Sequence, residues 1–324
     1  MSEEVLIRVE ELARFYGEVP AVRGVSFALR RGEVLGFLGP NGAGKSTTMQ
    51  VLAGALAPSA GQVLVGGVDL LDEPRAAKAQ IGYLPEQPPL YRELTVDEYL
   101  AYCARLRRVP RRAVGEAVAR AKARCGLADA GARLIGNLSK GYQQRVGIAQ
   151  AILHAPAVVI LDEPTVGLDP IQIREIRALI RELGGEHSVI LSTHILPEVQ
   201  AVCDRVLIIH QGQLVLNERV DRLALGLAEP ALRLALRHPP APEALAALPG
   251  VVRVEPGAAG RFQLFYREGE DPTDALVAQA VAAGWGLAEL SPVRRSLEEV
   301  FVELTCGEGP EAPRPGAMPK ARAA

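Results

Sequence analysis

The sequence predicts an α/β fold that carries a helical insertion and, toward its carboxyl end, a smaller α+β domain. Short apolar runs from Val5 to about Gly67 alternate with glycine turns, which predicts several strands around one early helix. The continuous apolar runs AVVIL and SVIL are typical of parallel strands that are buried on both faces. Between these regions, the Ala-, Arg- and Leu-rich stretch from about Leu94 to Leu138 favours helix throughout.

The composition indicates a globular protein of near-neutral charge. The chain has 324 residues, a formal net charge of −2 and 48% hydrophobic residues. These values exclude a disordered chain and a nucleic-acid binder with a strong basic field, so we expect no nucleic acid as a partner. No stretch approaches the roughly 20 apolar residues that a membrane-spanning helix needs. Any action at a membrane is therefore expected through a partner protein.

The four cysteines are scattered along the chain. Cys103, Cys125, Cys203 and Cys306 form no CxxC pair, and no histidine lies near them at metal-ligand spacing. We therefore expect reduced thiols, as in a cytosolic protein.

Past Glu218 the pattern changes and predicts a second domain. Residues 232–305 predict the order strand, helix, strand, strand, helix, strand and a last helix, SLEEVFVELT, which suits a small ferredoxin-like unit. We expect a first domain at 1–220, with its helical subdomain at about 90–140, and an accessory domain at 221–305. Residues 306–324 are rich in Gly, Pro and Ala, so we expect a disordered tail there.

A glycine-rich loop between the strand EVLGFL and a helix fits the pattern GxxxxGK[ST]. Its backbone N–H groups and the helix N-terminus would wrap phosphate oxygens, Lys45 would neutralise the outer phosphates, and Ser46 would hold Mg²⁺. By chance the bare pattern arises in about one chain of this length in a hundred. We therefore expect a phosphate site formed by Gly39, Pro40, Asn41, Gly42, Ala43, Gly44, Lys45, Ser46 and Thr47.

Two acids follow the buried strand VVIL. Asp162 would orient the metal ion through its water shell, and Glu163 would polarise the attacking water as a general base. The alternative is that both acids only cap the turn or helix that follows. The phosphate loop elsewhere in the chain favours the catalytic interpretation.

Two further polar residues take their interpretation from context. His194 follows the strand VILST and would reach the outermost phosphate from the carboxyl end of the sheet, although a single histidine there also suits a solvated loop. Gln87, in IGYLPEQPPLY, would ligate Mg²⁺ and report the nucleotide state to a partner. Taken by itself, Gln87 is more simply an ordinary polar loop residue between prolines.

A long helix begins after Leu138, in LSKGYQQRVGIAQAIL, with Ser139 as its expected N-cap. Helix capping alone would explain this serine. The helix N-terminus is also a second anion site, and one chain cannot join it to its own phosphate loop if the two lie on opposite sides of the helical insertion. The pattern therefore indicates a composite site across a dimer.

Taken together, six motifs resemble the nucleotide-binding subunit of ABC transporters over residues 5 to about 218. They are GPNGAGKST, the Gln87 loop, LSKGYQQRV, VVILDEP, GLDP and STH, in this order. The resemblance implies ATP and Mg²⁺ as ligands. It also implies a RecA-like P-loop ATPase core with an antiparallel β subdomain and an inserted helical subdomain.

The same resemblance implies a role for individual residues of this chain. Tyr16 would stack on adenine, and Ser139 and Gly141 would be the signature residues that face the partner's outermost phosphate. The other assignments are Gln87 as the Q-loop glutamine, Asp169 as the D-loop acid and His194 as the switch histidine.

One motif departs from the family's usual signature, LSGGQ. Lys140 stands in place of the first glycine, and Tyr142 in place of the glutamine. Because Ser139 and Gly141 remain, we expect hydrolysis to survive, while the hydrolysis rate and the geometry at the partner's site stay open. The variant LSKGYQQRVGIAQA, together with the final SLEEVFVELT, resembles the ATPases of bacterial exporters of the multidrug, polysaccharide and gliding-motility type.

The resemblance implies a transport ATPase. Two copies would bind two ATP molecules head to tail and drive a separate integral membrane permease, which would dock near residues 87–100 and set the substrate. The chain would then be cytoplasmic, held at the inner face of the cell membrane by its permease. Export is the favoured direction, and support of the dimer is the favoured role of the accessory domain.

Two other classes of protein remain as alternatives. A soluble ABC ATPase that acts on ribosomes, DNA or metal-cluster assembly would need no permease, but this chain has neither tandem cassettes nor a long coiled-coil insertion. The chain could instead be another P-loop enzyme, such as a kinase, but the signature and the switch histidine would then have no function.

Overall fold

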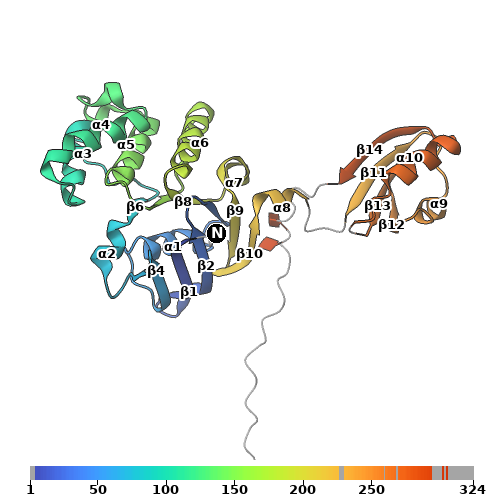
Figure 1. The fold of residues 1–324 in the computed structure, drawn as a ribbon, viewed down its shortest axis with the longest axis horizontal. Helices are drawn as coiled ribbons and strands as arrows, with labels where there is room; N and C mark the ends of the chain where they lie inside the picture. Colours follow the sequence, from blue (N-terminus) through green and yellow to red (C-terminus); the bar gives the residue numbers. More distant parts are fainter. Residues whose placement is uncertain are drawn as a thin grey trace, which may run out of the picture.

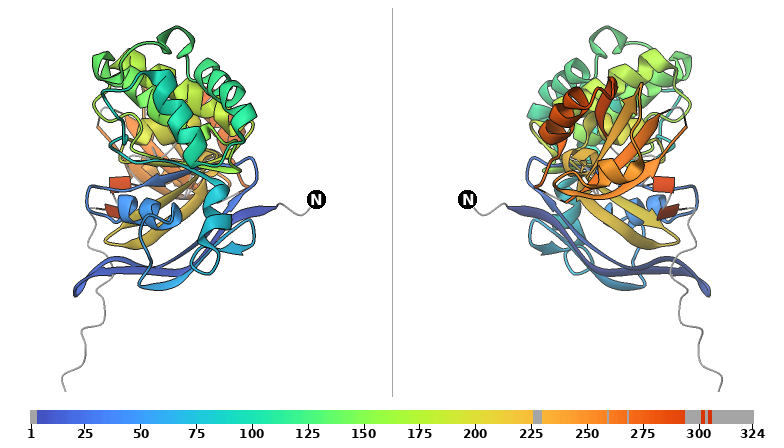
Figure 2. Two further views of the ribbon diagram at one scale, coloured as in Figure 1. Left: turned by 90° about the vertical axis from the view of Figure 1, so that its left-hand side faces the viewer. Right: turned by 90° about the vertical axis from the view of Figure 1, so that its right-hand side faces the viewer.

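The computed structural model describes residues 4–225, 230–258, 260–267, 269–293, 301–302 and 304–305. Over 4–225 an antiparallel sheet, a mostly parallel sheet and a helical layer follow one another (Figure 1). Both side views in Figure 2 show the helical layer and the antiparallel sheet at opposite ends of this unit.

The central sheet has six strands in the order β10-β9-β3-β8-β7-β6. The five neighbouring strands from β6 to β9 run parallel to one another, and the edge strand β10 pairs antiparallel with β9. The strands are β3 (Val34–Leu38), β6 (Ile81–Leu84), β7 (Val158–Asp162), β8 (Ser188–Thr193), β9 (Arg205–His210) and β10 (Gln213–Arg219). Both buried runs seen in the sequence are therefore parallel strands, and β9 and β10 form an antiparallel hairpin.

Every residue of β3, β7 and β8 is buried because cores lie on both faces of the central sheet. Successive side chains alternate between these cores, as the period of two requires. In β7, Val158 and Ile160 join the core shared with the antiparallel sheet and α1, whereas Val159 and Leu161 join the core shared with the helical layer.

The antiparallel sheet has the order β2-β1-β4-β5. Its strands are β1 (Val5–Tyr16), β2 (Val19–Arg30), β4 (Ala60–Val65) and β5 (Val68–Asp69). Helices α1 (Lys45–Leu52) and α2 (Pro74–Ala79) connect this sheet to the central one. The several strands around one early helix that the sequence predicts are present, with three strands, β1, β2 and β3, before α1 and β4 after it.

The helical insertion contains α3 (Val96–Leu106) and α4 (Val114–Arg124), and α5 (Lys140–Ile152) follows it. The expectation of helix throughout 94–138 is wrong in two places. Arg108 has a left-handed φ of 60° and Pro110 follows it, while Gly126 has a φ of 64°, so the chain turns after each helix. Residues 125–139 contain only short 3₁₀ segments at 128–130 and 135–137.

The remaining helices of this unit are α6 (Pro170–Gly184), α7 (Leu196–Val202) and α8 (Val220–Leu225). Asp169 caps α6, because its side chain accepts hydrogen bonds from the backbone N–H groups of Ile171 and Gln172. Over the described ranges, none of the helices has both the length and the apolar character needed to cross a bilayer.

Residues 231–293 form a second unit with its own core, which centres on Leu234, Leu264 and Trp285. Its elements are β11 (Ala231–Leu236), α9 (Pro242–Ala246), β12 (Val251–Pro256), β13 (Arg261–Tyr266), α10 (Thr273–Ala282) and β14 (Leu287–Val293). The sheet order is β12-β13-β11-β14, and all neighbouring strands are antiparallel.

The packing of the last described residues differs from expectation. Phe301 and Leu304, in the predicted helix SLEEVFVELT, pack against the core of the first unit, as Leu216 and Val220 do, rather than in the core of residues 231–293. The expected disordered tail at 306–324 and Cys306 lie outside the described residues. Cys103, Cys125 and Cys203 are free and buried, as expected of reduced thiols.

Candidate functional site

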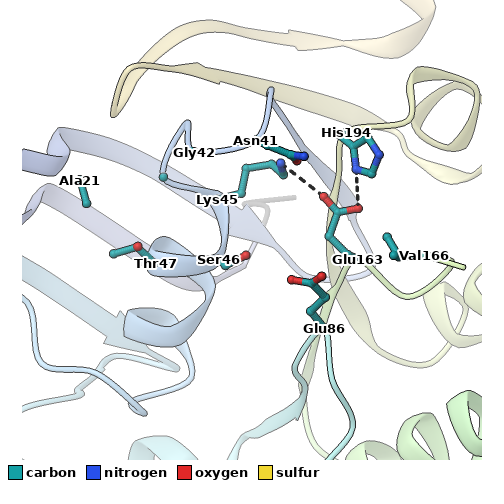
Figure 3. Close-up of a pocket in the computed structure, with 11 residues that line it drawn as sticks. Ala21, Asn41, Gly42, Lys45, Ser46, Thr47, Glu86, Glu163, Val166 and His194 are labelled. Carbon is teal, nitrogen blue, oxygen red and sulfur yellow. Dashed lines mark hydrogen bonds and ion pairs between the residues drawn. The ribbon is translucent and has the colours of Figure 1, made fainter.

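A cleft of ≈ 420 Å³ lies at the carboxyl ends of β3, β7 and β8 (Figure 3). The cleft brings the phosphate loop together with residues that follow three other strands, β6, β7 and β8. Parallel strands place these loops at one edge of the sheet, which is where open α/β folds bind ligands. The lining residues are Ala21, Asn41, Gly42, Gly44, Lys45, Ser46, Thr47, Glu86, Glu163, Val166 and His194.

Two glycines of the phosphate loop are required by close backbone contacts. Gly44 precedes α1 with a φ of 107°, and a Cβ added there would overlap the carbonyl oxygen of Ala21. A Cβ at Gly39 would overlap the carbonyl oxygen of Ile209. The loop therefore turns tightly and presents the N-terminus of α1, whose described first turn contains no acid, to the cleft.

Lys45 lies across the mouth of this loop. Its Nζ donates to the carbonyl oxygens of Gly39 at 2.9 Å and Pro40 at 3.3 Å. It also forms an ion pair with Glu163 Oε1 at 3.3 Å, and both side chains are at most 7% exposed. The ammonium group therefore neutralises the glutamate while it stays bound to the carbonyl oxygens of the glycine-rich loop.

Glu163 has a second partner on its other carboxylate oxygen. Nδ1 of His194 lies 2.9 Å from Oε2, and Figure 3 shows Lys45 and His194 each pointing to a different oxygen of the carboxylate. The backbone of Glu163 is left-handed, with a φ of 48°. For a residue other than glycine, such a conformation costs about 1–3 kcal/mol and persists only where its surroundings hold it.

Ser46 and Asp162 form a pair of oxygen donors beside the glutamate. Ser46 Oγ lies 3.4 Å from Asp162 Oδ1, and Asp162 is 2% exposed. Burial destabilises the ionised form of Asp162 and thereby raises its pKa. Hard oxygen ligands are those that Mg²⁺ prefers, so this pair fits the expected metal ion.

The N-terminal end of α5 lies outside this cleft. Ser139 caps the helix by accepting from the Tyr142 N–H at 3.4 Å, and both Ser139 and Lys140 are exposed. The side chain of Lys140 lies against Gly167, where an added Cβ would overlap Nζ. Gly141 is covered by the side chain of Gln172, and Asp169 is likewise exposed outside the cleft lining.

Two further predicted residues, Gln87 and Tyr16, lie outside the cleft lining. Gln87 is exposed, and its neighbour Glu86 lines the cleft instead. Tyr16 is 49% exposed, lies outside the lining and has the Arg14 guanidinium 5.1 Å from its ring centre. Sequence reasoning missed Ala21, Glu86 and Val166, and only Glu86, adjacent to the predicted Gln87, had a signal close by.

Curated relatives extend over most of the chain. The sequence is 40% identical over 207 residues to the ABC transporter ATP-binding protein NatA of Bacillus subtilis, covering 63% of this chain and 84% of that protein. It is 30% identical over 307 residues to the linearmycin resistance ATP-binding protein LnrL of the same species, covering 93% of this chain and 98% of the relative.

Solved structures and a family model give the same result. An ATP-binding subunit of an ABC transporter matches with a TM-score of 0.62 and 32% identity, over 68% of this chain and 92% of that one. The fold also matches, at 22% identity and a TM-score of 0.60, a dimeric ATP-binding cassette solved with ADP and Pi, over 66% of this chain and 99% of that one. The family model for ABC transporters matches residues 22–166. The chain belongs to the family of ABC transporter ATP-binding proteins.

Proposed function

We propose that this chain hydrolyses ATP as a head-to-tail dimer and drives export through a separate membrane permease. The observation that carries the proposal is the division of the predicted site. Lys45, Ser46, Asp162, Glu163 and His194 lie together, whereas the N-terminal end of α5 is exposed outside their cleft. A second copy can therefore supply what this cleft lacks.

In the proposed reaction, Glu163 holds the attacking water as general base and His194 fixes the orientation of its carboxylate. Ser46 and Asp162 hold Mg²⁺, which supplies charge neutralisation at the phosphates when bound. Lys45 binds the outer phosphate oxygens. Because Lys45 is paired with Glu163 in this structure, phosphate binding gives the ammonium a competing partner and frees one oxygen of Glu163 for water.

The dimer is proposed from the two half-sites. Ser139 and Gly141 lie at the start of α5, where backbone N–H groups and the helix dipole favour an anion. In a two-fold dimer the same surfaces meet twice, so each signature can face the partner's outermost phosphate. Asp169 and the adenine-stacking Tyr16 would then complete their contacts in the closed, ATP-bound dimer. Gln87 would need to move to reach the Mg²⁺ ion, since Glu86 occupies the cleft lining here.

The permease is proposed to dock on an exposed aromatic surface beside the Gln87 loop. Tyr91 and Tyr102 are 45% and 40% exposed and meet edge to face with ring centres 5.7 Å apart. Leu106, one turn further along α3, is 64% exposed. Docking here would place the chain at the cytoplasmic face of the membrane. The resistance function in the name of LnrL supports export as the direction.

We further propose that residues 221–305 act as an accessory domain of ferredoxin-like fold that supports the dimer. The β-α-β-β-α-β order and the sheet order β12-β13-β11-β14 support this assignment. The helical subdomain would extend over about 90–140 within the first domain, 1–220.

Replacing Asp162 by asparagine is expected to separate stability from activity. Asp162→Asn replaces a buried carboxylate, whose ionised form burial destabilises, with a neutral amide. The free energy of unfolding without nucleotide should therefore rise. Because the substitution also removes the proposed Mg²⁺ ligand, ATP hydrolysis should fall by about 100-fold or more. Thermal unfolding and steady-state hydrolysis measure the two effects. A lower unfolding temperature together with unchanged hydrolysis would contradict the assigned role.

Mixing two inactive variants tests the composite site. Lys45→Ala removes the phosphate-binding cation, and Ser139→Glu places a repelling carboxylate at the partner's phosphate while remaining compatible with the helix dipole. Each variant alone should be inactive. An equimolar mixture should recover about a quarter of the wild-type rate, because half of the dimers are mixed and each of these has one intact site.

As a control, a chain that carries both substitutions is mixed with each single variant. Neither mixture should regain hydrolysis. Hydrolysis rates of the mixtures at saturating ATP are the measurement. If the mixture stays as inactive as its components, or Ser139→Glu alone keeps the wild-type rate, the composite site is wrong.

Affinity capture from detergent-solubilised membranes of the native cell tests the permease. The tagged chain should recover a polytopic membrane protein in about one-to-one ratio, and Leu106→Asp should lose it because a charge enters the apolar interface. Leu71→Asp makes the same change at another exposed leucine, 56% exposed beyond β5, and should retain the membrane protein. Recovery of ribosomal or DNA-repair proteins without a membrane protein would favour the soluble alternative.

A further inference from the structure

We propose that Glu198 is a positioning residue that holds the Glu163 loop against the strand end carrying His194. Glu198 lies in the first turn of α7 and is 1% exposed. The inference rests on the proposed hydrolysis reaction and adds to it a residue that lies outside the cleft lining.

The carboxylate of Glu198 joins two segments of the chain through hydroxyl groups. Oε1 accepts a hydrogen bond from Thr165 Oγ1, and Oε2 accepts one from Thr193 Oγ1 at 2.7 Å. The two threonines are 2% and 0% exposed. Both carboxylate oxygens are therefore used, one for each segment.

These segments carry the two residues of the proposed water-activating pair. Thr165 follows Glu163 by two residues, and Thr193 directly precedes His194. The contact between His194 Nδ1 and Glu163 Oε2, at 2.9 Å, closes the arrangement into a ring. Moving either threonine would therefore move one member of that pair relative to the other.

The left-handed backbone of Glu163 explains why such a support is needed. This conformation is strained for a glutamate, and the surroundings must hold it. One stabilising contact is the hydrogen bond from the Glu163 N–H to the Ser192 carbonyl at 2.9 Å, which anchors the start of the loop to β8. The bond from Thr165 to Glu198 anchors the next turn of the same loop.

The charge arrangement around Glu198 favours positioning over simple packing. A buried carboxylate is costly, and an apolar side chain of similar size would be cheaper at such a place. Its cationic neighbour, Arg177 of α6, lies 3.9 Å from Oε1. Because α6 begins directly after the Glu163 loop, this contact ties a third element to the same carboxylate.

The donor and acceptor pattern shows what Glu198→Gln would break. Thr193 Oγ1 accepts from the Ile195 N–H at 3.0 Å and donates to Glu198, so its hydrogen points to the carboxylate. A glutamine has one acceptor oxygen in place of two. The substitution keeps the volume of the side chain but removes one of the two acceptors, so the Thr165 hydroxyl would have to turn and accept from the new amide instead of donating.

The test compares Glu198→Gln and Thr165→Val with wild type in ATP binding and steady-state hydrolysis. Misplacing the proposed base should lower kcat by about 10- to 100-fold, while the Kd for ATP changes by less than about twofold. Thr165→Ser, which keeps the hydroxyl group, should recover most of the rate that Thr165→Val loses. The double variant Glu198→Gln/Thr165→Val should be no slower than the worse single variant, because both break one ring.

Glu182→Gln is the matched control, because it makes the same chemical change at an exposed glutamate of α6. An unfolded Glu198→Gln protein would leave the isosteric Thr165→Val as the deciding variant. Wild-type kcat in both Glu198→Gln and Thr165→Val, with Glu163→Gln inactive, would overturn the role of Glu198 alone. A wild-type protein that does not hydrolyse ATP would instead overturn the proposed function.

Discussion

The site depends on the ion pair between Lys45 and Glu163, and the parallel sheet makes this pair possible. Lys45 begins the helix after β3, while Glu163 directly follows β7, two strands away in the sheet. These ends meet because β3, β8 and β7 run in the same direction. The buried pair keeps a strained glutamate next to the cation that we propose binds phosphate.

Most of the remaining features around the cleft support this pair. His194 holds the second oxygen of Glu163, Gly44 allows the close turn that starts α1, and Glu198 links the segments on which Glu163 and His194 lie. A buried pair of opposite charges is costly to break on one side only. In the proposed reaction, phosphate binding would break this pair, because the anion would bind the ammonium group while the carboxylate binds water.

Much of this arrangement could be predicted from the sequence, because it follows from short continuous segments. The phosphate loop, Asp162 and Glu163 depend on local pattern, and they stand at the ends of the buried strands β3 and β7 as expected. Glu198 could not be predicted, since it is separated from Thr165 by 33 positions and only the packing of α7 joins them. The choice of Glu86 over Gln87 in the cleft depends on the path of a proline-rich loop, which hydrophobic periodicity does not describe. The same limit applies to the breaks between α3, α4 and α5, where left-handed residues ended helices that composition favoured.

The most direct test of the central claim is sedimentation velocity of the Glu163→Gln variant with and without Mg-ATP. Neutralising the proposed general base should stop hydrolysis and keep two ATP molecules bound between two chains, since both half-sites remain intact. The account predicts a monomer without nucleotide or with ADP, and a dimer holding two ATP per pair of chains with Mg-ATP. A variant that binds ATP and stays monomeric at every protein concentration would contradict the account.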